Sequence, residues 1–142
     1  MEIDALVWVP DFNDVWASGK VVGLRQAESS SSIDARIEIC LDASGQVVAL
    51  TPEEVLLRNP DRDDAEADDL IRLPHLHEPS ILSALVQRAT KGNVYTHTGP
   101  ILLAVNPYRK LPIYTVDYVN MYNANGLDLS SKRLPPHLYS VA

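Results

Sequence analysis

The chain has a single cysteine, Cys40, so no disulfide can form within it. A protein without internal disulfides fits a reducing compartment. Cys40 lies in a strand-like run, where a free cysteine is more often a small buried residue than a nucleophile. No apolar run reaches the roughly 18 residues that a membrane-spanning helix needs, so we expect no membrane span. The start of the chain, MEIDALVWVP, lacks the basic residues of a signal peptide.

Positive charge is scarce in the first half of the chain. Residues 1–69 contain 16 acidic and 5 basic side chains, a balance of −11, whereas residues 70–142 contain 3 acidic and 7 basic ones, a balance of +4. Together they give the formal net charge of −7. Halves of opposite balance suggest two units with different partners. Because phosphates repel an acidic surface, we expect no nucleic acid among the partners.

Residues 1–58 are predicted to form a small antiparallel barrel of about five strands, because short alternating runs are separated there by turn residues. In ALVWVPD, Val7 and Val9 share one face, and in ARIEICL, Ile37, Ile39 and Leu41 share one face. The second run returns through DASG to QVVAL, which predicts a hairpin with a four-residue loop.

Other short segments of this barrel have the composition of loops. Residues 11–14, DFND, and the serine-rich residues 28–34, ESSSSID, are expected to be solvated loops. Ser18-Gly19 is a turn signal inside VWASGKVVGLRQA, so a turn is expected to interrupt this strand region.

The barrel is predicted to end in a helical turn and an acidic connector. Thr51, followed by Pro52 and by Glu54 three residues later, has the pattern of a capping box and predicts a short turn. Residues 59–69, NPDRDDAEADD, are rich in carboxylates that cannot bury themselves. These residues are therefore expected to form a solvated connector.

From residue 70 the pattern becomes that of a mixed helix and strand unit. A helix is predicted from about Glu78, with Pro79 at its first position and Gly92 at its far end. Its apolar residues recur at helical spacing and are expected to pack in the core: Ile81, Leu82, Leu85 and Val86.

Two strands, in VYTHTG and PILLAVNP, are predicted to follow, joined at Gly99-Pro100. The run ILLAV is apolar on both faces and is expected in the interior of a sheet whose other strands are supplied by later sequence. Without those strands it is expected to present an open apolar edge. A short helix is predicted in TVDYVNMYNAN, with Val116, Val119 and Tyr122 facing inward. LPPHLYSVA is expected to begin a further helix at its two prolines.

Three histidines have structural interpretations that outweigh functional ones. His75 and His77, with Glu78, do not complete a metal site, because no further Cys or His lies nearby. We interpret them as part of a polar segment that docks the helix. His97 is interpreted as a cross-strand packing residue rather than a nucleotide contact.

Several of these strings, in this order, resemble the start of a myosin heavy chain. VWVPDFNDVWASGKVV resembles the small Src-homology-like barrel that precedes many myosin motors, and DDLIRLPHLHEPSILSAL resembles the opening of the motor domain. VYTHTGPILLAVNPYRKLPIY resembles the first motor strands and the adenine loop, and PPHLYSVA resembles the helix leading toward the phosphate loop. The resemblance implies an α+β fold, in which the barrel and the connector precede an incomplete motor domain of P-loop NTPase type in residues 70–142.

The resemblance also implies that the loop after ILLAV holds the adenine of ATP. The residues that it assigns to this loop are Asn106, Pro107, Tyr108, Arg109, Lys110, Pro112 and Tyr114. Their chemistry suits the role, since prolines stiffen a loop, an asparagine amide both donates and accepts, and cations favour an anionic nucleotide. Taken alone, the same residues more readily describe a strand-ending loop whose tyrosines pack and whose cations are solvated.

The sequence lacks the motif of phosphoryl transfer. That chemistry requires a phosphate cradle, a lysine and a Mg²⁺ ligand, which a sequence supplies as G-x-x-x-x-G-K-S/T. No such string occurs, so no catalytic residue and no Mg²⁺ ligand is predicted in this chain. The resemblance implies a cytoplasmic, cytoskeletal ATPase that uses ATP with Mg²⁺ and moves along actin, with its phosphate loop and actin-binding surfaces in later sequence.

An alternative function is a non-catalytic protein-interaction module built on the acidic barrel. Trp8 and Trp16 would then line a peptide groove, whereas in the motor interpretation they pack inside the barrel. The two functions differ in what the barrel does by itself, since only an interaction module captures a protein partner without the rest of the chain.

Overall fold

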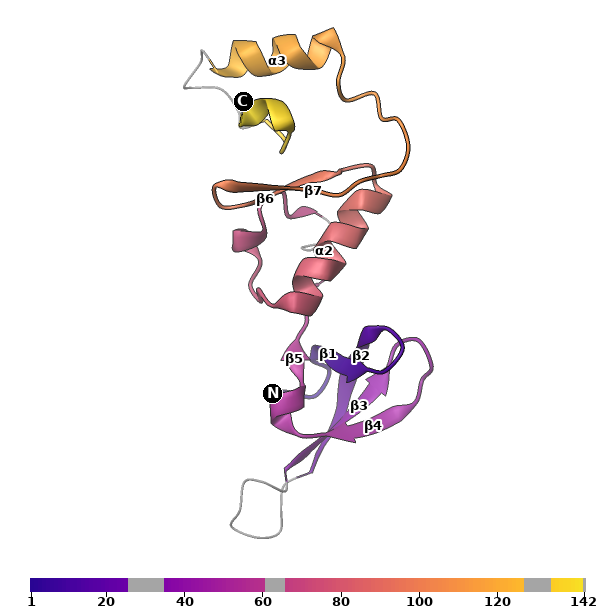
Figure 1. Ribbon diagram of the computed structural model, residues 1–142. Helices are drawn as coiled ribbons and strands as arrows, with labels where there is room; N and C mark the ends of the chain where they lie inside the picture. The colour runs from indigo at the N-terminus through magenta and orange to yellow at the C-terminus, as the bar shows by residue number, and fades with distance from the viewer. Residues whose placement is uncertain (26–34, 61–65, 127–133, 142) are drawn as a thin grey trace. The chain divides into compact units, whose positions relative to one another are not determined.

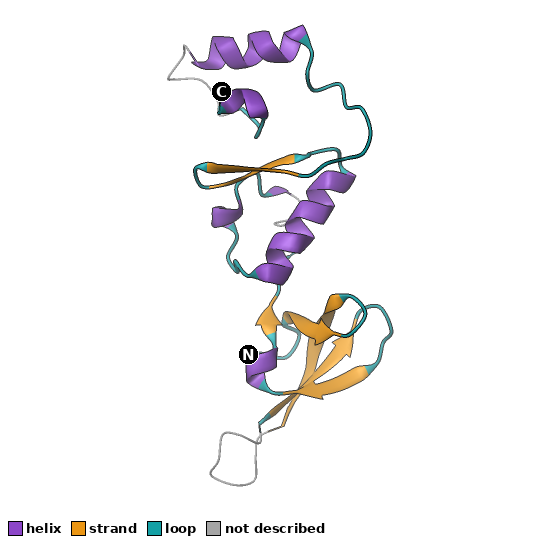
Figure 2. Cartoon of the chain, viewed as in Figure 1, coloured by secondary structure: helices purple, strands orange, loops and turns teal. Residues whose placement is uncertain are grey.

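Figure 1 shows the computed structural model of the chain, which describes residues 1–25, 35–60, 66–126 and 134–141. The chain divides into two compact units, Met1–Pro60 and Asp61–Ala142. Strands dominate the first unit, whereas the second combines helices with a two-stranded sheet (Figure 2). The expected loop at residues 28–34 lies outside the described residues.

The first unit is a five-stranded antiparallel sheet, as the strand patterns predict, with the order β4-β3-β2-β1-β5. From β1 to β4, each strand pairs with the next strand in the sequence, so antiparallel pairs of consecutive strands build most of the sheet. Its elements are β1 (Leu6–Asp11), β2 (Val15–Arg25), β3 (Arg36–Leu41), β4 (Val47–Leu50), the 3₁₀ turn η2 (Pro52–Glu54) and β5 (Leu56–Leu57).

The core of this unit follows the alternation of its strands. Val7 and Val9 of β1 and Ile37 and Ile39 of β3 are buried, which confirms the predicted faces. Leu41 packs against the same cluster. A slip of one residue in the pairing would turn all of these side chains to solvent, so the buried face fixes the register.

Ser18-Gly19 does not form the predicted turn, because β2 runs without interruption through both residues. A Cβ atom at Gly19 would lie 2.8 Å from the carbonyl oxygen of Cys40 and 2.8 Å from the Cγ2 atom of Ile39 on the neighbouring strand. Glycine is therefore needed here for the close approach of two strands, not for a turn.

Side-chain hydrogen bonds form two of the predicted turns. The Glu54 carboxylate accepts from the Thr51 backbone N–H at 2.9 Å and from the Thr51 hydroxyl at 2.7 Å, which confirms the capping box. These bonds lower the pKa of Glu54 below its ordinary value. In the DFND loop, the Asp11 carboxylate accepts from the backbone N–H groups of Asn13 and Asp14.

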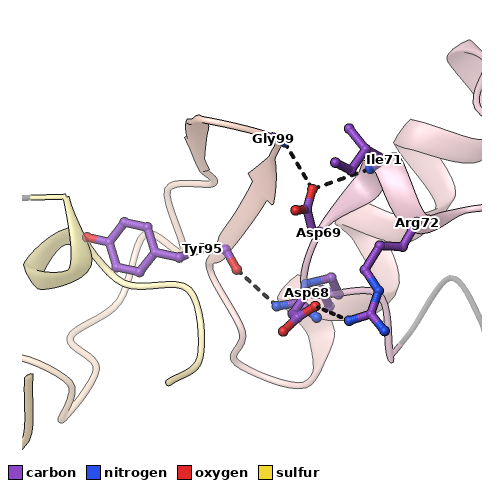
Figure 3. A network of polar contacts seen from close by, with 7 residues as sticks. Asp68, Asp69, Ile71, Arg72, Tyr95 and Gly99 are labelled. Carbon is purple, nitrogen blue, oxygen red and sulfur yellow. Dashed lines mark hydrogen bonds and ion pairs between the residues drawn. The ribbon is translucent and has the colours of Figure 1, made fainter. Parts of the chain in front are cut away.

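The expected solvated connector is buried at both of its ends. Residues 61–65 lie outside the described residues, but Asn59 is 0% exposed and Asp69 is 4% exposed. The Asp69 carboxylate accepts from the backbone N–H groups of Gly99, at 3.0 Å, and Ile71, at 3.4 Å (Figure 3). Asp69 therefore belongs to the second unit. Its carboxylate was expected to be hydrated, but backbone N–H groups from two segments take the place of water as its hydrogen-bond donors.

The described part of the second unit contains two helices, two short 3₁₀ turns and one β-hairpin. The hairpin strands pair across the predicted turn at Gly99, where φ is +61°. His97 lies opposite Leu102 in this ladder, as predicted. The elements are η3 (Leu70–Arg72), α2 (Glu78–Thr90), β6 (Tyr95–Thr98), β7 (Ile101–Ala104), α3 (Val116–Gly126) and η4 (Leu138–Ser140).

The ends of α2 lie where the sequence predicts them. The helix begins at Glu78, so Pro79 is its second residue rather than its first. It ends in a Schellman motif, in which the Asn93 N–H donates to the Arg88 carbonyl at 2.9 Å and Gly92 has φ of +83°. Glycine adopts this left-handed conformation without the steric cost that a side chain adds.

Only part of the apolar stripe of α2 packs inside this unit: Ile81 packs against the buried core cluster, as expected, whereas Leu82 and Val86 do not. Leu82 and Val86 are 52% and 53% exposed. The buried face instead carries Ser80, Ala84 and Arg88, which follow one another at helical spacing. Small side chains let the helix approach its neighbours closely, and this preference is invisible to a search for large apolar residues.

Arg88 anchors α2 to β6. Its Nε donates to the Thr96 hydroxyl at 2.9 Å, and its Nη2 donates to the Tyr95 carbonyl at 3.0 Å. Burial lowers the pKa of Arg88, while the charge of Asp68 opposes that shift. Asp68 also pairs with Arg72 at 3.6 Å (Figure 3). A buried guanidinium must keep its acceptors, so this contact fixes the helix on the hairpin.

Two further expectations in the second unit are wrong, and a third stays a prediction. In the described residues β7 pairs only with β6, and Ile101 is 60% exposed. This is the open apolar edge expected without the further strands, so the interior position of ILLAV stays a prediction. In α3, Tyr122 is buried as predicted, but Val116 and Val119 are 73% and 37% exposed. In LPPHLYSVA the described residues form the 3₁₀ turn η4, which begins at Leu138 rather than at the two prolines. An apolar pattern identifies a face but not what covers it.

Replacing Arg88 is predicted to destabilise the second unit. In Arg88→Ala, the Thr96 hydroxyl and the Tyr95 carbonyl lose a charged donor, which lowers the free energy of unfolding by about 3 kcal/mol. Native-state amide hydrogen exchange in α2 and β6 measures this loss. The control is Gln87→Ala, because the Gln87 side chain bonds only to Ser83 in the same helix among the described residues. Its effect should stay within about 0.5 kcal/mol, and equal effects of the two variants would contradict the anchoring role.

Candidate functional site

The loop after β7 begins with a turn that its own side chain forms. Asn106 Oδ1 accepts a hydrogen bond from the Tyr108 N–H at 2.9 Å, as in an Asx turn. Tyr108 has φ of +50°, a left-handed conformation that few residues other than glycine adopt. Its side chain is 93% exposed. Residues held in such conformations cluster at functional sites, where the surrounding structure imposes them.

The start of this loop lies beside an apolar groove along α2. Asn106, Pro107 and Arg109 line the groove, whose volume is about 480 Å³. The rest of the lining comes from α2 and the end of the hairpin: Leu82, Leu85, Val86, Ala89, Thr90 and Val105. Three of the four apolar residues expected in the core, Leu82, Leu85 and Val86, therefore form one wall of a groove at the loop.

Tyr114, at the far end of the loop, is held by Tyr95 of β6. Their hydroxyl oxygens are 2.7 Å apart, so one hydroxyl donates to the other. Tyr114 is 53% exposed, whereas Tyr95 is 9% exposed. Part of the Tyr114 ring therefore stays accessible while its hydroxyl is engaged inside the protein.

His137 lies within an aromatic cluster behind the loop. Its Nε2 atom is 2.9 Å from the Ile113 carbonyl oxygen, and its Nδ1 atom accepts from the Tyr139 N–H at 3.1 Å. The side chain is 3% exposed. Five tyrosine rings have centroids 4.6 to 5.7 Å from the imidazole centroid: Tyr95, Tyr114, Tyr118, Tyr122 and Tyr139.

Burial changes the acidity of the phenols in this cluster. Burial, with the hydrogen bond to Tyr114, raises the pKa of Tyr95 to about 12. Burial and the neighbouring Tyr118 also raise the pKa of Tyr122, whose hydroxyl donates to the Pro135 carbonyl at 2.6 Å. Tyr95 and Tyr122 therefore remain neutral near pH 7 and act as hydrogen-bonding and packing groups.

The predicted base-binding residues do not all lie together in the structure. Asn106, Pro107 and Arg109 lie at the groove, and Tyr114 lies against His137. The remaining predicted residues are exposed side chains between these places: Tyr108, Lys110 and Pro112. The loop is therefore fixed near its two ends and open in its middle.

Sequence reasoning missed two residues that hold this loop, His137 and Tyr95. A signal existed for His137, because a histidine directly after two prolines in an apolar run is a polar group that needs buried partners. No local pattern marks Tyr95, since its partner Tyr114 is 19 residues further along the chain.

The structure also locates the other residues that the sequence analysis considered for a functional role. His77 is the N-cap residue of α2. Among the described residues, no group of three or more His, Cys, Asp or Glu side chains is placed to hold a metal ion. The Arg58 guanidinium lies 5.3 Å from the ring centroid of Trp8, and Trp16 and Cys40 are half-buried.

None of the helices in the described segments has the length and apolar character to cross a membrane.

Comparison with known proteins gives matches to one family along the chain. Residues 67–142 match the myosin head (motor domain) family. The chain is 32% identical over 136 residues to the myosin-H heavy chain of Dictyostelium discoideum, and 36% identical over 149 residues to unconventional myosin-Va of Gallus gallus. These matches cover 96% and 97% of this chain, which spans about 7% of the length of each relative. Neither match favours the alternative function as an interaction module.

The bond between Tyr95 and Tyr114 is predicted to contribute, after burial, to the raised pKa of Tyr95. Its pKa in the folded chain, about 12, lies above the ordinary value of 10.0, so the stability it contributes is complete below pH 10 and is lost as the pH rises toward 12. Tyr114→Phe removes one hydroxyl of the pair and should lower the pKa of Tyr95, which phenolate absorbance measures. Tyr108→Phe removes an exposed hydroxyl and should leave that pKa unchanged. Equal shifts in the two variants would show that the bond has no part in the titration.

Proposed function

The chain belongs to the myosin head (motor domain) family, and we propose that its loop from Asn106 to Tyr114 forms the adenine side of an ATP site. The whole protein would be an actin-based motor driven by ATP. Because the chain spans about 7% of the length of its relatives, motor activity is proposed for the whole protein and base binding for this chain.

The observation that carries the proposal is a loop that is shaped before any ligand binds. Pro107 and Pro112 fix two φ angles, and the Asx turn of Asn106 holds Tyr108 in its left-handed conformation. A preformed loop loses little conformational entropy on binding, so more of the contact energy appears as affinity.

Asn106 is the residue that we assign to the edge of the purine. The Asx turn uses its Oδ1 atom, which fixes the side chain and leaves the amide NH₂ group to donate a hydrogen bond. The side chain lines the groove along α2, whose apolar wall shields one side of a planar base from water.

Tyr114 and Arg109 supply the other parts of the recognition. The exposed part of the Tyr114 ring is available to a base while Tyr95 holds its hydroxyl. Arg109 brings positive charge to the groove, where it favours an anionic nucleotide. Contacts of this kind amount to about 4 kcal/mol, which corresponds to millimolar affinity.

The phosphates and the metal ion of ATP are not assigned to this chain. It contains no G-x-x-x-x-G-K-S/T string, and its described residues provide no cluster of side chains that fits Mg²⁺. We therefore propose that other parts of the whole protein supply the phosphate loop, the Mg²⁺ ligands and the actin contacts. Such a protein would work in the cytoplasm, at the cytoskeleton.

The amide of Asn106 is predicted to control binding of adenosine to the 142-residue chain. The wild type should show adenosine-dependent NMR shifts in residues 106–114, with an affinity of about 1 mM. Asn106→Asp keeps the oxygen that accepts from the Tyr108 N–H but lacks the NH₂ group, so the affinity should fall about fivefold. Adenosine carries no phosphate, so the new carboxylate does not act by repelling the ligand.

The control for this experiment is Asn120→Ala, because Asn120 is an exposed asparagine on α3, outside the loop. It should bind adenosine as the wild type does. If the wild-type chain shows no adenosine-dependent shift in residues 106–114, the proposed function is wrong.

A further inference from the structure

We propose that His137 is a positioning residue that holds the base-binding loop from behind. The proposal rests on the proposed function of that loop. His137 lies outside the loop, in the segment before η4, and reaches it through the contact of 2.9 Å between Nε2 and the Ile113 carbonyl oxygen. Ile113 directly precedes Tyr114, so the contact fixes the backbone at the far end of the base site.

The partners of the imidazole define its tautomer. A carbonyl oxygen only accepts hydrogen bonds, so the contact with Ile113 requires a proton on Nε2. A backbone N–H only donates, so the contact with Tyr139 requires Nδ1 to be without a proton. The neutral ring with its proton on Nε2 satisfies both contacts, and flipping the ring would break both.

The rings around His137 restrict its orientation. Tyr118 and Tyr122 of α3 stack on it with interplanar angles of 28° and 29°, and Tyr95 of β6 meets it edge-on at 67°. The imidazole therefore joins a helix, the hairpin and the segment before η4. Its Nε2 atom is aimed at Ile113 by packing on several sides.

Tyr114 is consequently restrained in three ways. Its backbone follows Ile113, its hydroxyl bonds to the Tyr95 hydroxyl, and its ring centroid lies 5.7 Å from that of His137. A side chain fixed before the ligand arrives contributes its contact without a further ordering cost. His137 thus affects base binding without touching the base.

The contact with Tyr139 offers a purely structural alternative. Through Nδ1, His137 caps the turn η4, and this could be its entire role. The two roles use different atoms of the ring, so amide side chains of different length separate them. Glutamine places an NH₂ group near the position of Nε2, whereas asparagine places an oxygen near the position of Nδ1.

The test compares His137→Gln with His137→Asn in the 142-residue chain, with adenosine as the probe. His137→Gln should keep the bond to the Ile113 carbonyl and bind adenosine within about twofold of the wild type. His137→Asn should keep the cap of η4 but lose the loop contact, which weakens adenosine binding about fivefold. In the same variant, the backbone order parameters of Ile113 and Tyr114 should fall from about 0.85 to below about 0.6, with α2 unchanged.

The reverse pattern, with affinity and loop order kept in His137→Asn and lost in His137→Gln, would assign His137 to capping alone and overturn the proposal. Wild-type behaviour of both variants would overturn it as well. If neither variant folds, the scalar coupling across the hydrogen bond from Nε2 of His137 to the Ile113 carbonyl decides in the wild type, because its presence supports the loop contact and its absence overturns the proposal. If the wild type does not bind adenosine, the proposed function is wrong. The order parameters of Ile113 and Tyr114 in His137→Asn then still test whether His137 positions the loop.

Discussion

The buried guanidinium of Arg88 is the contact on which the second unit depends. It bonds to the Thr96 hydroxyl and the Tyr95 carbonyl, so it joins the last turn of α2 to β6. Its donors point in fixed directions, and the contact therefore sets an orientation that an apolar residue of similar size would leave free. Because β6 and β7 form one hairpin, this orientation also decides where the chain leaves β7 and where Asn106 begins the loop.

A loop fastened at its ends and open in its middle is well suited to binding. At the near end, Asn106 closes its own turn beside the groove of α2. At the far end, Tyr95 holds the side chain of Tyr114, and His137 bonds to the backbone of Ile113. The two fastening side chains at the far end, Tyr95 and His137, are buried, so they constrain the loop without competing for a ligand at its exposed surface.

The first unit could be predicted well from sequence, and the second less well. Alternation alone located the buried faces of β1 and β3, because one side of an antiparallel sheet faces the core and the other faces water. The same logic failed for α2, where Ala84 is buried while Leu82 is half-exposed. It failed because the buried face of a helix depends on the shape of the elements that it packs against. Where these elements approach closely, a small residue fits and a large apolar one does not.

The sequence by itself determined the features whose partners lie within a few residues. These include the capping box of Thr51 and Glu54, the end of α2 at Gly92 and the position of the candidate loop. Only the tertiary structure decided which distant groups meet, such as His137 and Ile113, which are 24 residues apart. The physical reason is that a hydrogen bond between distant segments depends on how both pack, and a side chain leaves no periodic trace of a partner it meets only after the chain has folded.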